Sequence, residues 1–181
     1  MRSGVAAAAC LLLLPDWAAA HPVDEAVQSA YLTLARGEVR LELDLTPGTA
    51  VAAALLSSLD ANTDQHVDDA EAQAYALRVL QQSSLSLDGV TTAWRLEKVS
   101  VPPYQGLKLQ GDTLRIFAAA GRAERAGAHT LRYANHYEPA KSQCIANVFI
   151  QAGEGWRYRV ERQQHSDDGR LLTVAFTGVV R

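Results

Sequence analysis

A period-two pattern between Val27 and Leu45 restricts the possible folds more than any other stretch of the sequence. In its second half, VRLELDL (39–45), four aliphatic side chains alternate with three charged ones. Because successive side chains of a β-strand point to opposite faces, this alternation predicts strands with one buried face and one solvent-exposed face. Arg36-Gly37-Glu38 interrupts the pattern, so we expect a β-hairpin that turns at this tripeptide.

The second half of the chain consists mainly of short apolar segments separated by turn residues. We predict strands over 85–89, 91–101, 113–119, 129–135, 144–150, 156–164 and 171–180. Ser166-Asp167-Asp168-Gly169 predicts a tight turn between the last two of them. Many short strands joined by such turns are typical of an antiparallel sandwich or barrel.

Between the hairpin and these strands, the apolar period changes from two to three and four. Apolar side chains recur at helical spacing over 49–59 and again over 69–83. This spacing predicts two helices, and Thr49 is a candidate side-chain cap for the first. The predicted fold class is therefore α+β: a mainly antiparallel, β-sandwich-like domain with an inserted helix–loop–helix at about 49–83.

The segment between the two predicted helices, DANTDQHVDDAE (60–71), follows the spacing of an EF-hand calcium loop. The candidate ligands, at loop positions 1, 3, 5, 7, 9 and 12, are Asp60, Asn62, Asp64, the backbone carbonyl of His66, Asp68 and Glu71. Carboxylate, amide and carbonyl oxygens are hard ligands, so the expected ion is Ca²⁺ and not a soft metal. Val67 at position 8 is expected to pack inward.

One loop position departs from the template, because Gln65 stands where glycine normally makes a sharp turn. A non-glycine residue in a left-handed conformation costs about 1 kcal/mol, and no second loop of this kind is present to pair with the first. We therefore expect weak, largely structural calcium binding. Two alternatives remain: a relic loop that no longer binds metal, or Asp68, Asp69 and Glu71 acting only at a helix N-terminus. The second alternative does not explain the acidic and amide residues at alternate positions before them.

The first twenty residues have the features of a cleaved secretory signal peptide. Arg2 precedes the apolar run VAAAACLLLL, and small residues precede a cleavage site after Ala20. The run is shorter than the roughly 20 residues that span a bilayer. Lipoprotein processing at Cys10 is the weaker alternative, because the leucines follow that cysteine. We expect one periplasmic or secreted domain over 21–181, in which Cys144 is the only cysteine and has no partner for an intramolecular disulfide.

Composition and motifs point away from several functional classes. The formal net charge of −3 does not indicate nucleic-acid binding, and no nucleophile, phosphate-loop or zinc-protease motif is present. We expect no enzyme activity and no small-molecule substrate. His129, His136 and Cys144 are expected to be ordinary surface or core residues. His21 would be the N-terminal residue after cleavage and is a candidate weak transition-metal site, with a solvent-exposed terminus as the alternative.

Several features together resemble a known arrangement. They are the signal, His21-Pro22, the hairpin, the acidic loop before a helix, and LRYANHYEP (131–139) before an apolar strand. The chain is similar over about 21–180 to the extracytoplasmic N-terminal domain of some bacterial nickel/cobalt-type transporters, although only the loop is a specific motif. The resemblance implies an EF-hand domain with Ca²⁺ or, alternatively, an accessory or sensor module for nickel or cobalt uptake with a membrane metal transporter as partner. The sequence stops at Arg181, where such a transporter would begin its membrane helices, so transport itself is not implied.

Overall fold

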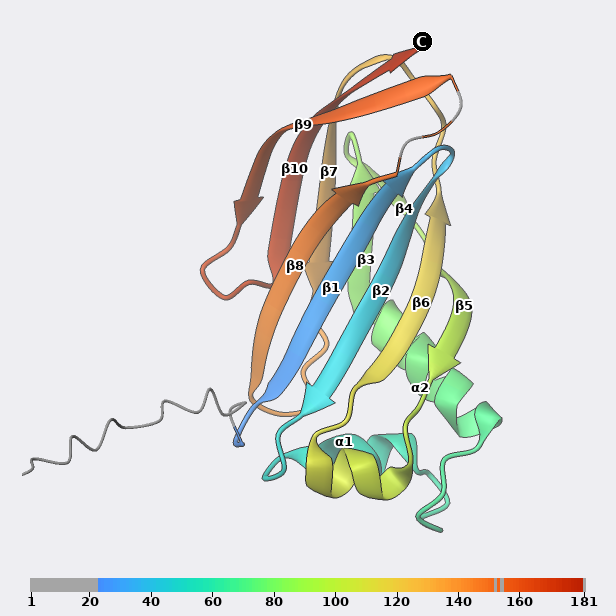
Figure 1. Cartoon of the computed structure of the whole chain (residues 1–181), viewed down its shortest axis with the longest axis vertical. Coiled ribbons are helices and arrows are strands. Elements are labelled where there is room, and N and C mark those ends of the chain that lie inside the picture. Colours follow the sequence, from blue (N-terminus) through green and yellow to red (C-terminus); the bar gives the residue numbers. More distant parts are fainter. Residues whose placement is uncertain (1–22, 152, 154, 181) are drawn as a thin grey trace, which may run out of the picture.

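The computed structural model describes residues 23–151, 153 and 155–180. Two five-stranded sheets pack face to face (Figure 1). The first contains, in spatial order, β5 (Arg95–Ser100), β6 (Leu114–Gly121), β2 (Glu38–Pro47), β1 (Ala26–Ala35) and β8 (Ser142–Ile150). The second contains β4 (Val90–Thr92), β3 (Ser83–Leu87), β7 (Gly127–Asn135), β10 (Leu171–Val180) and β9 (Trp156–His165). The predicted α+β, sandwich-like fold class is confirmed.

All strand pairs are antiparallel except β1 with β8, which run parallel. The predicted hairpin is β1 and β2, with Gly37 in a left-handed conformation (φ 77°) at its turn. The aliphatic side chains of 39–45 point into the sandwich: Val39, Leu41, Leu43 and Leu45 are each at most 1% exposed. The period-two pattern therefore identified the strands and also the face that is buried.

Two helices carry the chain from the first sheet to the second. α1 (Ala52–Leu59) and α2 (Asp69–Gln81) follow β2 and precede β3, and both lie at one end of the sandwich (Figure 1). Each helix contributes to the same core as the strands, through Leu55, Leu56 and Leu59 of α1 and through Tyr75, Ala76, Val79 and Leu80 of α2. The inserted helix–loop–helix is thus part of the domain and not an appendage.

The structure corrects the predicted start of the first helix. α1 begins at Ala52, its N-cap is Val51, and no side chain caps it, so the Thr49 prediction is wrong. The reason is a tight turn, in which the Val51 N–H donates to Gly48 O at 3.0 Å. The Ala50 N–H is also held by Val23 O at 2.8 Å. These backbone bonds hold 48–51 in a turn, so the helix begins only at Ala52.

The predicted strand 91–101 is two strands that belong to different sheets. β4 pairs with β3, whereas β5 pairs with β6. The chain changes sheets at Trp94, whose ring packs edge-on against Tyr133 with centroids 6.4 Å apart. The sequence also gave no signal for η1 (Gly106–Gln110), a short π-helix that packs against α1. A five-residue element is too short to produce a helical period that could be recognised.

The free edge of β8 is protected by the turn between β9 and β10, which lies where it was predicted. His165 Nε2 lies 2.7 Å from Ala146 O, and the Gly169 N–H donates to Ser166 O at 3.0 Å. Gly169 has φ 69°, and a Cβ atom there would lie 1.9 Å from Cys144 O. Only glycine fits this position, so the turn can cover backbone groups that an exposed edge strand would leave unpaired.

Candidate functional site

The acidic loop starts directly after α1, at a buried carboxylate. Asp60 is the C-terminal cap of α1 and is only 4% exposed. Its Oδ1 accepts a hydrogen bond from the Asp64 N–H at 3.2 Å, and its Oδ2 accepts one from the Gln65 N–H at 3.0 Å. The first loop position therefore organises the backbone of the fifth and sixth positions.

Two residues of the loop have left-handed backbone conformations. Thr63 has φ 61° and Gln65 has φ 64°, so Gln65 makes the turn for which the calcium-loop template uses glycine. Such a conformation costs a non-glycine residue about 1 kcal/mol. Two further bonds stabilise the turn: the Asp64 N–H to Asn62 Oδ1 at 2.9 Å and the His66 N–H to Asp64 Oδ1 at 2.8 Å.

Glu71 ties the two ends of the loop together. Its Oε1 accepts from the N–H groups of Ala61 and Asn62 at 2.9 and 3.1 Å, and its Oε2 accepts from the Asp68 N–H at 3.2 Å. The Glu71 N–H in turn donates to Asp68 Oδ1 at 2.8 Å, which completes a capping box at the start of α2. The capping that this alternative expects of Asp68 and Glu71 is therefore present at the start of α2.

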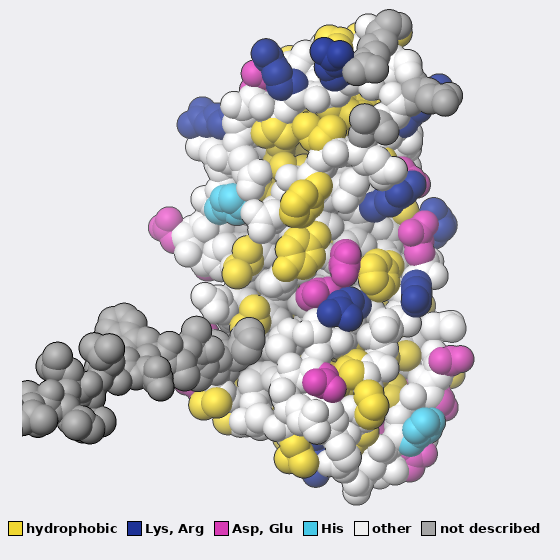
Figure 2. Space-filling view, in the orientation of Figure 1, with side chains coloured by type: hydrophobic (Ala, Val, Ile, Leu, Met, Phe, Trp, Pro, Cys, Tyr) yellow, Lys and Arg dark blue, Asp and Glu magenta, His cyan; other side chains and the backbone are white. Residues whose placement is uncertain are grey.

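Among the residues that the structure describes, the carboxylates of this loop have no cationic partner. None of the ion pairs between described residues involves an acid of 60–71. Figure 2 shows acidic side chains gathered at the lower right, over the end that carries the helices. In the described part of the chain, however, no three His, Cys, Asp or Glu side chains form a group that could hold a metal ion. The oxygens of Asp60 and Glu71 accept hydrogen bonds from backbone N–H groups of the loop.

His66 and Val67 lie between Gln65 and Asp68 in the loop. His66 is exposed, and its backbone N–H donates to Asp64 Oδ1. Its backbone carbonyl is the predicted metal ligand. Val67 packs against the core, as predicted from its position in the loop. His66 and Val67 also form one wall of an apolar groove whose other wall is 101–104.

The other candidates from the sequence do not assemble into a second metal site. His21 lies outside the described residues, so its transition-metal role and the sensor alternative stay predictions. His136 is exposed, whereas Cys144 is buried, and burial raises the pKa of the Cys144 thiol. A raised pKa favours the thiol form over the nucleophilic thiolate.

A buried polar network that the sequence did not indicate fixes α2 on the sandwich. Tyr75 of α2 and Tyr137, which follows β7, have their hydroxyl oxygens 2.6 Å apart. The Tyr137 carbonyl accepts from Gln28 Nε2, and Gln28 Oε1 accepts from Asn135 Nδ2, both at 2.9 Å. The partners are up to 109 residues apart in the sequence, so no local pattern could reveal them.

His129 is part of a second polar cluster. Its Nδ1 lies 2.7 Å from Asp88 Oδ2 and its Nε2 lies 2.8 Å from the Arg125 carbonyl oxygen. Both partners can only accept, so both ring nitrogens must donate and the ring is the imidazolium. The bond to Asp88 raises the pKa of His129, assisted by the Arg125 carbonyl and opposed by burial and the Arg122 charge.

We expect this pair to make stability depend on pH. The pKa of His129 is raised in the folded state. The pair's contribution to the free energy of unfolding is therefore complete below the unfolded-state pKa of about 6.5, and it is lost as the pH rises through the folded-state pKa. Asp88 is 46% exposed on its side chain, so solvent limits the loss to about 0.5–1 kcal/mol. Urea unfolding at pH 6 and pH 9 should show this loss in the protein and not in His129→Gln. An identical pH dependence in both proteins would contradict the assignment.

Comparisons of the chain with models of known protein families, with curated proteins and with solved structures found no match. Among the described residues, no helix is both long enough and apolar enough to cross a membrane.

Proposed function

We propose that this protein is a non-catalytic, periplasmic or secreted calcium-binding domain whose single EF-hand-like loop, 60–71, binds one Ca²⁺ weakly. The observation that carries the proposal is the backbone of Gln65, which has φ 64° and donates its N–H to Asp60 Oδ2. This turn is the one that the calcium-loop template requires at its sixth position. The loop has adopted it although the residue is not glycine.

The charge of the loop supports a cation as its ligand. Asp60 is 4% exposed and has no ion-pair partner among the described residues. A buried carboxylate without a nearby cation is costly even when it accepts hydrogen bonds. A divalent cation would offset this cost and the mutual repulsion of the neighbouring acids.

The hydrogen bonds within the loop are compatible with this ligand set. An ionised carboxylate has about four lone-pair sites on its two oxygens, so an oxygen that accepts one N–H can also bind a cation. Glu71 Oε1 already accepts two N–H groups, so we expect it to release at least one of them when it acts as the last ligand. This exchange, together with the strain at Gln65, is consistent with a Kd of about 10⁻⁴–10⁻³ M.

Calcium would act here mainly on structure. Asp60 belongs to the end of α1 and Glu71 to the first turn of α2, so one ion bound by both would fix the angle between the helices. Both helices bury side chains in the common core. The ion would thus stabilise the domain as a whole.

Thermal unfolding tests this function. For a Kd of about 10⁻⁴–10⁻³ M, 10 mM Ca²⁺ stabilises the folded state by about 1.4–2.7 kcal/mol, or roughly 3–10 °C in Tm for a domain of this size. We expect Glu71→Gln to lose most of this rise. Asp69→Asn is the matched control, because Asp69 lies in the same helical turn but outside the proposed ligand set. Equal rises in all three proteins would refute the assignment.

A further inference from the structure

β6 ends on the side away from α1 (Figure 1). A second concave site lies at this end of the strand. The cleft has a volume of about 210 Å³. Its polar lining comes from three segments distant in sequence and consists of Asp88, Thr92, Arg122, Arg125 and His129. Leu87 and Val90 provide an apolar wall.

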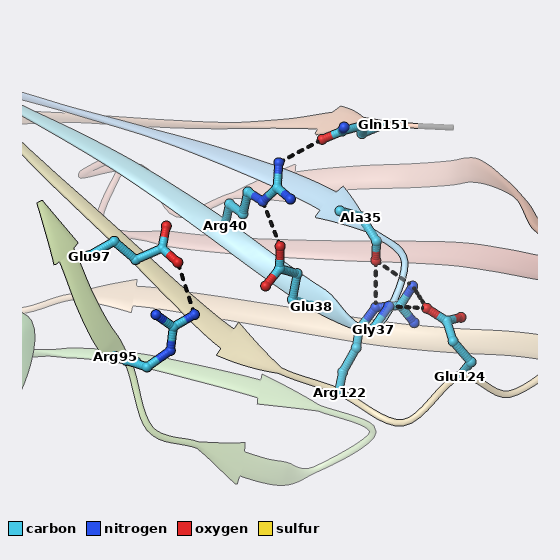
Figure 3. A network of polar contacts seen from close by, with 9 residues as sticks. All are labelled: Ala35, Gly37, Glu38, Arg40, Arg95, Glu97, Arg122, Glu124 and Gln151. Atoms are coloured by element: carbon cyan, nitrogen blue, oxygen red, sulfur yellow. Dashed lines mark hydrogen bonds and ion pairs between the residues drawn. The ribbon is translucent and has the colours of Figure 1, made fainter. Parts of the chain in front are cut away.

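Arg122 is held rigidly at this cleft. Its side chain is 3% exposed, and its Nε and Nη2 donate to the Ala35 carbonyl at 3.3 and 3.0 Å (Figure 3). Nη2 also lies 2.9 Å from Glu124 Oε1, and the guanidinium carbon lies 4.8 Å from the centroid of the Tyr158 ring. The remaining nitrogen, Nη1, takes part in none of these bonds to Ala35 and Glu124, and the guanidinium also interacts with the Tyr158 hydroxyl. A fixed guanidinium at the lining of a cleft is suited to bind an oxyanion.

Two further cations line the same cleft. His129 is the imidazolium, because both of its ring nitrogens face acceptors. The Arg125 guanidinium forms no hydrogen bond or ion pair with the described residues. Two carboxylates oppose the three cations, those of Asp88 and Glu124. Asp88 uses both oxygens, one for His129 and one for the Thr130 N–H at 2.8 Å. These five ionised groups therefore carry a net charge of +1.

We propose that this cleft binds a small monocarboxylate that carries a compact apolar group. The carboxylate would be bound by Arg122 Nη1 and the Arg125 guanidinium, and the apolar group would lie on Leu87 and Val90. Val90 is 69% exposed in the free protein, so such a ligand would cover apolar surface that now faces water. A volume of about 210 Å³ exceeds the roughly 150 Å³ cavity that holds benzene. This ligand site is independent of calcium binding at the acidic loop.

Benzoate and benzamide are a matched pair of probes for this site, because they share shape and differ in charge. We expect benzoate, titrated into the ¹⁵N-labelled protein at pH 6, to shift the amide signals of Val90, Thr92 and Ala123 with a submillimolar Kd. Benzamide should bind at least tenfold more weakly. Arg125→Gln should weaken benzoate at least tenfold, whereas Arg132→Gln, an exposed residue of β7 outside the cleft lining, should leave its Kd unchanged.

Arg125 is exposed, so its substitution tests the site without removing the buried Arg122. Equal binding of the two probes would overturn the proposal, as would an unchanged benzoate Kd in Arg125→Gln or shifts centred outside the cleft. Acetate should bind more weakly than benzoate, because it lacks the apolar group. Equal affinity for acetate would remove the role of the apolar wall and overturn the stated ligand class.

Discussion

Arg122→Leu is expected to lower the free energy of unfolding by about 3–5 kcal/mol, measured by urea denaturation at pH 7. The substitution removes one member of a buried ion pair and leaves the Glu124 carboxylate without its cation. Glu124 Oε2 is already buried without a hydrogen-bond partner in the described structure, so the carboxylate would keep only the bonds that Oε1 accepts from the Gly37 N–H and the Tyr158 hydroxyl. The change also removes the bonds to the Ala35 carbonyl and the contact with the Tyr158 ring.

The chain contains a matched control for this prediction. Arg159 and Glu161 form an ion pair at 2.8 Å with the same spacing in sequence, but their side chains are 77% and 40% exposed. We expect Arg159→Leu to cost less than about 1 kcal/mol. The double substitution Arg122→Leu, Glu124→Leu should cost less than Arg122→Leu alone, because no unpaired buried charge remains. A loss below about 1 kcal/mol in Arg122→Leu would contradict a stabilising role for the buried Arg122–Glu124 pair.

Leu59→Ala is expected to lower the free energy of unfolding by about 2.7–5 kcal/mol in one cooperative transition. Leu59 is the last residue of α1 and is fully buried (0% exposed), so its truncation removes buried apolar surface and leaves a cavity. Because this side chain belongs to the core shared by the helices and both sheets, we expect the whole domain to be destabilised. Circular dichroism and tryptophan fluorescence should report the same midpoint.

Leu77 provides the comparison for this second substitution. It lies on α2 but is 48% exposed, so Leu77→Ala should change stability by less than about 0.5 kcal/mol. If Leu59→Ala instead produced two separate transitions, the helix–loop–helix would be an independently stable insertion. That result would remove the proposed link between calcium at the loop and stability of the sandwich.

The sequence predicted those parts of the fold that depend on local periodicity. The alternation in 39–45 located β2 and its buried face, and the change to helical spacing located α2 within two residues at its C-terminal end. The prediction was wrong where tertiary contacts override local pattern. The 91–101 segment crosses between sheets at Trp94, and residues before Ala52 are held in a turn by backbone bonds to Gly48 and Val23.

The two sites differ in how far the sequence could reveal them. The acidic loop is contiguous, so the spacing of its candidate ligands and the left-handed turn at Gln65 could be predicted from the sequence. The hydrogen bonds from the Ala61 and Asn62 N–H groups to Glu71 could not, because no local pattern specifies them. The arginine-lined cleft joins residues from β3–β4, the end of β6 and β7. Arg122 gave no sequence signal, because what distinguishes it is burial against Tyr158 and Glu124.

Calorimetric titration of the metal-stripped protein with Ca²⁺ is the most direct test of the proposed function. We expect a one-site isotherm with a Kd of about 10⁻⁴–10⁻³ M, lost in Asp60→Asn and retained in Asp69→Asn. Asp60 is the decisive position, because its carboxylate accepts from both Asp64 and Gln65 and so defines the turn of the loop. The absence of calcium-dependent heat up to about 10 mM, roughly ten times the weakest expected Kd, would contradict calcium binding by this loop. An isotherm that Asp60→Asn leaves unchanged would do the same, and would leave the acids of this loop with a helix-capping role alone.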